Sequence, residues 1–143
     1  MHINNNKLFV GMDLHKNTSS FCVKDYAGTI LRQEKILTDK NQIRDFMLSL
    51  GSTASIVLEP VSQWYTYADM LEQLGHDVHL AHPMKVKAIA SARIKTDKID
   101  ASVLADLLRS NLLPALNYKT PFLHIKPKAQ YLKKWYNIKR HRR

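Results

Sequence analysis

The chain has 143 residues, 45% of them hydrophobic, and a formal net charge of +10. This length suffices for one domain that buries a sizeable core. No apolar run approaches the roughly 20 residues of a membrane span, and the amino terminus lacks the layout of a signal peptide. A lone cysteine, Cys22, excludes an internal disulfide framework. We therefore predict a cytoplasmic protein with no membrane partner.

The charge is concentrated at one end of the chain. Residues 1–113 have a net charge of only +1, whereas residues 114–143 contain nine Lys and Arg and no acid. We predict a globular domain over 1–113 and a basic, partly helical or disordered extension over 114–143. Such an extension suits a phosphate backbone or another anionic surface. A merely solvated charged tail is the alternative.

The first part of the chain predicts three strands in succession. Leu8–Leu14 is a short apolar run rich in β-forming residues. Ser19–Lys24 and Thr29–Leu37 follow, and residues 25–28 carry the turn chemistry that joins them as a hairpin. Three such strands form an antiparallel meander.

The pattern then alternates between helices and strands. Asp39 can cap a helix that Gly51 ends. A run that is apolar on both faces is typical of a central parallel strand. The remaining predicted elements are a strand over Ala54–Glu59, a helix over about 62–74, a strand over Asp77–Ala81, a short helix from Pro83, and a last helix from Asp97 to about Asn111 capped by Thr96.

This order predicts an α/β protein with a mixed sheet and flanking helices. A meander followed by alternating helices and parallel strands is the order of the ribonuclease H-like fold. Right-handed crossovers would place the fourth strand beside the first. The carboxyl ends of the parallel strands would then meet at one edge of the sheet, where α/β proteins usually bind ligands.

Four acids stand out along this pattern: Asp13 inside the first strand, Glu59 at the end of the fourth, and Asp97 and Asp100 where the last helix begins. A carboxylate on a buried strand is costly unless it is paired, exposed at a cleft or bound to a cation. Carboxylate oxygens suit Mg²⁺ or Mn²⁺, and two such ions promote phosphoryl transfer. Alternatively, Asp97 and Asp100 are first-turn acids on one solvated helix face.

Basic residues flank the proposed site and could neutralise phosphates, although a solvated face is an open alternative. The candidates are Lys85, Lys87, Arg93, Lys95 and Lys98, with Lys133, Lys134, Lys139, Arg140, Arg142 and Arg143 in the extension.

Two other groups of residues are weaker candidates for a functional role. His76, His79 and His82 are evenly spaced, but residues three apart on a strand point to opposite faces, so we do not expect a zinc site. Trp64, Tyr65 and Tyr67 open a predicted helix. We expect them to pack in the core, with base stacking as the alternative.

Four segments resemble the amino-terminal domain of DEDD-type insertion-sequence transposases, the IS110 family. They are residues 10–16 (VGMDLHK), 58–60 (LEP), 82–87 (HPMKVK) and 95–101 (KTDKIDA). The last is the most specific. The resemblance covers about residues 7–114, although the family often has a small residue and then Thr-Gly after Pro60, where this chain has Val61-Ser62-Gln63.

The resemblance implies a RuvC-like domain with Asp13, Glu59, Asp97 and Asp100 as its acidic tetrad. It implies Mg²⁺-dependent (or Mn²⁺-dependent) DNA strand cleavage and exchange, guided by a structured RNA in a homo-oligomer. Family members continue to a second domain with a catalytic serine, so we expect this chain to be a truncated copy. The alternative function is an inactive nucleic-acid-binding remnant.

Overall fold

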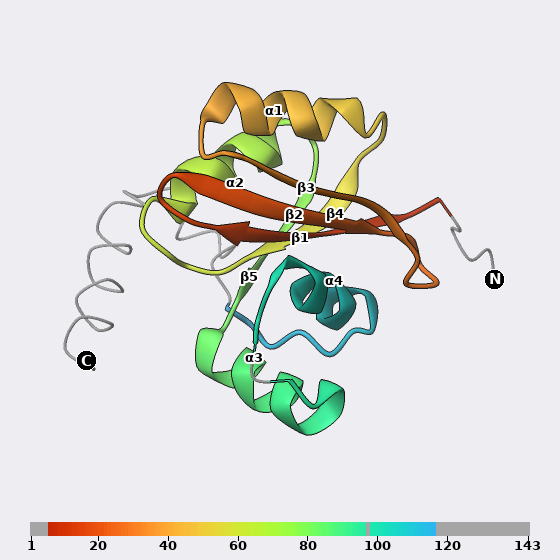
Figure 1. Ribbon diagram of the computed structural model, residues 1–143. Coiled ribbons are helices and arrows are strands. Elements are labelled where there is room, and N and C mark those ends of the chain that lie inside the picture. The colour runs from red at the N-terminus through yellow and green to blue at the C-terminus, as the bar shows by residue number, and fades with distance from the viewer. Residues whose placement is uncertain (1–5, 97, 117–143) are drawn as a thin grey trace.

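The computed structural model describes residues 6–96 and 98–116. A single six-stranded sheet lies between two layers of helices (Figure 1). Within the described part of the chain, no helix has both the length and the apolar character needed to cross a membrane.

The strands follow the order β3-β2-β1-β4-β5-β6 across the sheet. β1 pairs antiparallel with β2 and parallel with β4, and β5 is parallel to β4. This meander with two parallel strands added beside β1 is the ribonuclease H-like arrangement, and it confirms the predicted fold. The strands are β1 (Leu8–Leu14), β2 (Thr18–Lys24), β3 (Ile30–Leu37), β4 (Ala54–Leu58), β5 (Asp77–Ala81) and β6 (Ala115–Leu116).

The helices divide between the two faces of the sheet. One face is covered by α1 (Lys40–Ser49) and α2 (Trp64–Gln73), the other by α3 (Pro83–Ile89) and α4 (Ala101–Arg109) (Figure 1). Both connections between the parallel strands run through helices, α1 and α2, as parallel strands require.

Alternation along β1 sends its side chains to two different environments. Val10 and Met12 are fully buried in the larger core, which packs against α1 and α2. Gly11 faces α4 instead, because a methyl group there would lie 1.8 Å from the carbonyl oxygen of Ala101. Only a glycine permits the backbone of a helix to approach a strand so closely.

Helix α1, on the opposite face of the sheet from α4, begins and ends where the sequence predicted. The Asp39 side chain accepts a hydrogen bond from the Gln42 N–H at 3.1 Å, which is the N-cap contact. Gly51 follows the helix with φ 73° and donates its N–H to the Leu48 carbonyl. Both features confirm the expected limits of α1.

The start of the last helix was predicted wrongly. Thr96 does not cap it, since the Thr96 hydroxyl accepts the Lys98 N–H at 3.2 Å in a local turn. Asp100 is the N-cap, accepting the Val103 N–H at 3.0 Å, and α4 begins at Ala101. Asp100 therefore precedes the first turn, and the prediction that Asp97 and Asp100 share a helix face there is wrong.

Two further elements were not predicted. After α3 the chain continues as a five-residue π-helix, η1 (Ala90–Ile94), and Lys95 then takes a left-handed conformation with φ 57°. The two-residue strand β6 pairs antiparallel with β5 and forms the edge of the sheet on that side. The sheet thus continues to Leu116.

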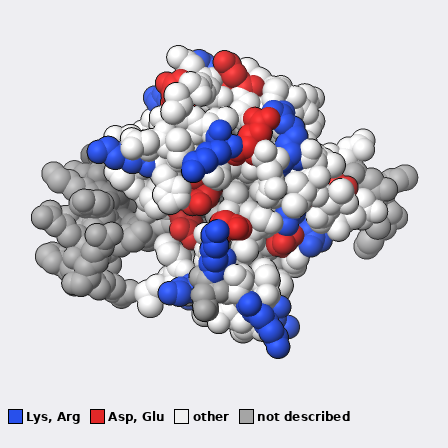
Figure 2. Space-filling model, in the orientation of Figure 1, with Lys and Arg blue, Asp and Glu red and all other residues white. Residues whose placement is uncertain are grey.

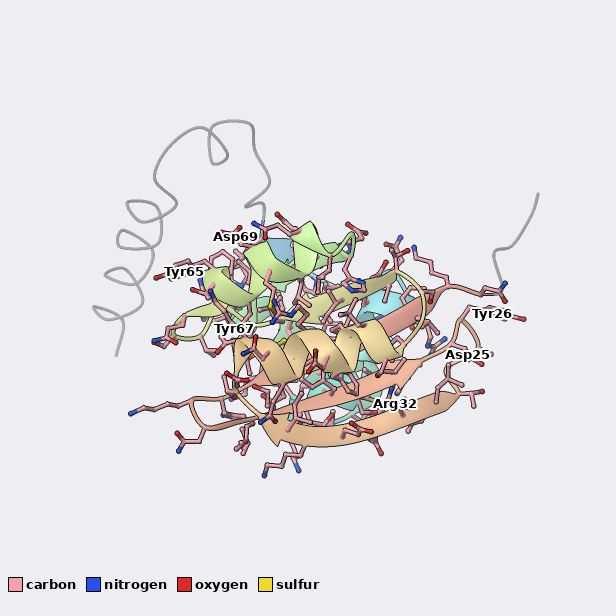
Figure 3. All side chains as sticks on the ribbon, turned by 90° about the horizontal axis from the view of Figure 1, so that it is seen from above. Asp25, Tyr26, Arg32, Tyr65, Tyr67 and Asp69 are labelled. Atoms are coloured by element: carbon pink, nitrogen blue, oxygen red, sulfur yellow. The ribbon has the colours of Figure 1, made fainter. Side chains whose placement is uncertain are left out.

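The aromatic residues at the start of α2 serve mainly the core. Trp64 and Tyr67 are buried, as expected, whereas Tyr65 is 39% exposed. In Figure 3, Tyr65 lies at the opposite end of the sheet from Asp25 and Tyr26, which form the β2–β3 turn.

Candidate active site at the carboxyl edge of the sheet

The register of the parallel strands brings the first two predicted acids level with each other. Met12 of β1 pairs with Leu58 of β4. Asp13 and Glu59 are the next residue along each strand, so they are level with each other, Asp13 one residue before the end of β1 and Glu59 just past the end of β4. Asp13 is on the same face of β1 as Gly11, two residues before it, which is the face that α4 covers.

The direction of α4 brings the third acid toward the same corner. Ala101, at the start of α4, lies over Gly11, and Asp106 pairs with Lys24, which is level with Phe9 near the start of β1. The helix therefore runs antiparallel to β1. Its amino-terminal end, with Asp100, lies toward the end of the strand that carries Asp13.

The Asp13 carboxylate lies next to the imidazole of His15, two residues later in the chain. Oδ1 of Asp13 lies 3.1 Å from Nε2 of His15, and the Asp13 side chain is 29% exposed. The residues after β1 are held by Thr38, which follows β3, because the Thr38 hydroxyl donates to the His15 carbonyl at 2.6 Å. Asp13 is thus half-buried on a supported strand end and open to solvent.

The remaining two acids differ in what the structure describes. Glu59 is half-buried, and its carbonyl accepts the Val61 N–H at 2.9 Å. Asp97 lies outside the described residues. In the described part of the chain, no three His, Cys, Asp or Glu side chains are grouped so that they could hold a metal ion. The donors at this corner are nevertheless carboxylates, the ligand type that hard divalent cations prefer.

Basic side chains lie along the chain that leads to this corner. Figure 2 shows acidic side chains close together near the middle of one face, with Lys and Arg side chains beside them. All five described candidates are exposed, and six more lie outside the described residues. The exposed ones are Lys85, Lys87, Arg93, Lys95 and Lys98; the others are Lys133, Lys134, Lys139, Arg140, Arg142 and Arg143.

The three evenly spaced histidines have separate roles. Nδ1 of buried His76 accepts the Ala54 N–H at 3.0 Å, and burial lowers the pKa of this imidazole. His79 pairs with Asp77 at 2.8 Å, and His82 caps α3. Each of the three histidines therefore has a different partner.

Sequence reasoning missed two features, one beside the candidate site and one at the far end of α4. His15 could have been connected to Asp13, since residues two apart on a strand share a face. The ion pair between Lys24 and Asp106 gave no signal, because its partners are 82 positions apart in the sequence.

Comparison with known proteins assigns the chain to a family. The sequence profile of the IS110-type DEDD family, described as "Transposase", matches residues 10–121. The transposase for insertion sequence element IS1533 of Leptospira borgpetersenii is 32% identical over an alignment of 108 residues, and the match covers 73% of this chain. The aligned part spans 31% of that relative's length.

Two solved structures are also similar. One is a ROK family transcriptional regulator, a homologue of the E. coli MLC protein, with TM-score 0.46, 15% identity and coverage of 63% of this chain and 31% of that one. The other is T. thermophilus RuvC in complex with a Holliday junction substrate, with TM-score 0.40, 12% identity and coverage of 77% and 99%.

Proposed function

The chain belongs to the IS110-type DEDD transposase family, and on that premise we propose that it is the nuclease-type domain of a transposase. Its reaction would be metal-dependent cleavage and exchange of DNA strands during movement of an insertion sequence. One observation carries the proposal. It is supported by the register of β1 and β4, which sets Asp13 level with Glu59, and by the direction of α4, whose amino-terminal end with Asp100 lies toward the same end of the sheet.

We propose that Asp13, Glu59, Asp97 and Asp100 hold the metal, Mg²⁺ or Mn²⁺. Bound there, a pair of such ions would supply Lewis-acid stabilisation of the attacking and leaving oxygens of a phosphodiester. The protein's part is to fix carboxylates on rigid elements. Asp13 is on the central strand, and Asp100 is held by its hydrogen bond to the first turn of α4.

The proposed substrate is DNA, and its backbone would follow the basic residues that precede Asp100. Lys85 and Lys87 on α3, Arg93 on η1, and Lys95 and Lys98 after it are exposed. Each lysine that neutralises a phosphate contributes to the salt dependence of binding. A structured guide RNA and a homo-oligomer belong to the same proposal and rest on the family resemblance.

Metal titration of the 143-residue chain tests the proposal. Mn²⁺ binding would be measured by calorimetry for the natural protein and for Asp13→Asn and Asp100→Asn. Each variant loses one anionic donor while keeping a similar shape, so affinity should fall by more than the ~10–100-fold typical of a lost supporting contact.

A matched control is available on the other side of the sheet. Asp45 is an exposed acid on α1, so Asp45→Asn removes the same charge away from the corner and should leave Mn²⁺ binding unchanged. If the natural chain and the Asp13→Asn and Asp100→Asn variants respond alike to Mn²⁺, the proposed metal centre is wrong.

DNA binding is tested separately through its dependence on salt. Replacing Lys85 or Lys87 by Ala should weaken binding of duplex DNA for all sequences alike and reduce the salt slope by about one for each lost phosphate contact. Lys35→Ala, on the exposed edge strand β3, is the control. If the salt dependence of DNA binding is the same in the α3 variants and the control, α3 does not contact the DNA backbone.

A further inference from the structure

We propose that the ion pair between buried Lys24 and half-buried Asp106, whose side chain is 31% exposed, is a positioning device. It fixes the direction of α4 and so the place of Asp100 at the candidate site. This inference rests on the proposed function, because Asp100 matters here as a ligand of the proposed metal. Neither residue of the pair belongs to the predicted tetrad.

Lys24 is an unusual residue for its location. It ends β2, its residue surface is only 4% exposed, and Nζ lies 2.8 Å from Oδ2 of Asp106 on α4. Removing an ammonium group from water without a compensating charge is costly. The Asp106 carboxylate is therefore held where the buried Lys24 ammonium meets it, and α4 cannot slide along the sheet without separating the two charges.

A second contact holds the same carboxylate from the far end of the helix. Nη2 of Arg109 donates to Oδ1 of Asp106 at 3.4 Å, and Nη1 donates to the Tyr26 carbonyl at 3.3 Å. The Arg109 guanidinium also lies against Gly28, where a methyl group would be 3.0 Å from Cζ. The end of α4 is thus tied to the β2–β3 turn as well as to β2.

Two separated contacts fix the axis of α4. Near its start, Ala101 lies against Gly11 of β1 with no room for a side chain between them. Five residues later, Asp106 is tied to Lys24. At a rise of about 1.5 Å per residue, these points are roughly 7–8 Å apart along the axis. Because a helix is rigid over that length, holding both points sets where Asp100 projects.

Stability alone does not account for this ion pair. A buried ion pair commonly stabilises a fold no more than apolar side chains of similar volume. The apolar side chains Leu104 and Leu107 already attach α4 to the sheet. Apolar contacts are non-directional, whereas a 2.8 Å ion pair tolerates little displacement. The pair therefore supplies orientation that the apolar face does not.

The test compares Lys24→Met with Lys35→Met in the 143-residue chain. Lys24→Met keeps the length of the side chain and leaves Asp106 with Arg109, so no buried charge is stranded. Lys35→Met makes the same change on an exposed residue of β3. Two quantities are measured. One is Mn²⁺ affinity, and the other is the hydrogen-exchange rate of the Val103 amide, which donates a hydrogen bond to the Asp100 carboxylate.

We expect Lys24→Met to weaken Mn²⁺ binding about tenfold, the scale for loss of a supporting contact, and to speed Val103 exchange. Lys35→Met should change neither. Folded Lys24→Met with natural Mn²⁺ affinity and natural Val103 exchange would overturn the inference. If Lys24→Met does not fold, Lys24→Gln, which keeps a hydrogen-bond donor for Asp106, is used instead. Its Mn²⁺ affinity and Val103 exchange are then compared in the same way.

The two proposals fail in different ways. If the natural chain binds no Mn²⁺, the proposed metal centre is wrong, whatever Lys24 does. Val103 exchange then still decides whether the ion pair orients the start of α4, and unchanged exchange in the Lys24 variants would reject that orientation.

Discussion

The two faces of the sheet are built from the same strands but differ in chemistry. Toward α1 and α2, β1 presents Val10 and Met12 to a large apolar core. Toward α4, the same strand presents Gly11 and Asp13, and the apolar cluster on that side has fewer buried members. One face supplies most of the buried apolar area, and the other carries the close backbone contact and the charges.

This difference separates stability from site geometry. Apolar burial is non-directional and roughly proportional to area, so the α1 and α2 face tolerates small movements at little cost. The α4 face depends on one glycine, one ion pair with a buried lysine and one cap. We expect substitutions on the first face to lower stability, and substitutions on the second to change the candidate site as well.

The largest expected effects come from neighbouring residues of β1 that face opposite sides. Met12→Ala removes a fully buried side chain and should lower the free energy of unfolding by about 2–5 kcal/mol. Gly11→Ala forces α4 away from β1 and should cost about 1–3 kcal/mol. Urea denaturation measures both losses.

Mn²⁺ titration under conditions where both variants are folded then distinguishes them. Met12→Ala should keep the affinity of the natural chain, whereas Gly11→Ala should reduce it, because displacement of α4 carries Asp100 with it. Equal affinities in the two folded variants would show that the faces do not divide their roles in this way.

A smaller effect separates the two roles of Asp100. Asp100→Ala should lose about 0.5–2 kcal/mol of stability, because the Val103 N–H loses its cap. Asp100→Asn should lose little, since Asn caps helices about as well as Asp. Thermal unfolding without metal measures this contrast. Equal destabilisation by Ala and Asn would mean that the charge, rather than the cap, holds the start of α4.

The smallest effect lies at the opposite end of β4, away from the candidate site. Burial lowers the pKa of His76, so the unfolded chain binds its proton more readily than the folded chain. Stability from neutral His76 is fully present above the unfolded value of about 6.5 and is lost as the pH falls through the lowered folded value.

Comparison of melting temperatures at about pH 7.5 and about pH 5.5 checks this sign. His76→Asn keeps an acceptor for the Ala54 N–H but cannot titrate, so its acid-induced decrease should be smaller than that of the natural chain. A decrease of the same size in both proteins would exclude His76 as the source.

The sequence was sufficient where a pattern repeats over several residues. The limits of β1 and β5 were predicted correctly, and the order of elements indicated that β4 pairs with β1. Asp39 and Gly51 predicted the two limits of α1, because Asp is favoured at a helix N-cap and Gly is favoured just after a helix ends.

Prediction failed where the outcome depends on distant partners. Thr96 and Asp100 are both good capping residues, and local chemistry does not choose between them; the contact of Ala101 with Gly11 accompanies the later start. A two-residue strand such as β6 has no pattern of its own and exists through its pairing with β5. The roles of Asp13, Glu59, Asp97 and Asp100 as metal ligands stay predictions.

The position of β1 in the middle of the sheet has a consequence for folding. β1 is near the start of the chain and can pair early with β2, but its other edge stays open until β4 arrives. The acids at residues 13, 59 and 100 are separated by 46 and 41 positions. Closing loops of that length carries an entropic cost before any contact compensates it. The corner of the sheet should therefore assemble late, after both crossovers have formed, and a nascent chain would have to extend past α4 before its acids could act together.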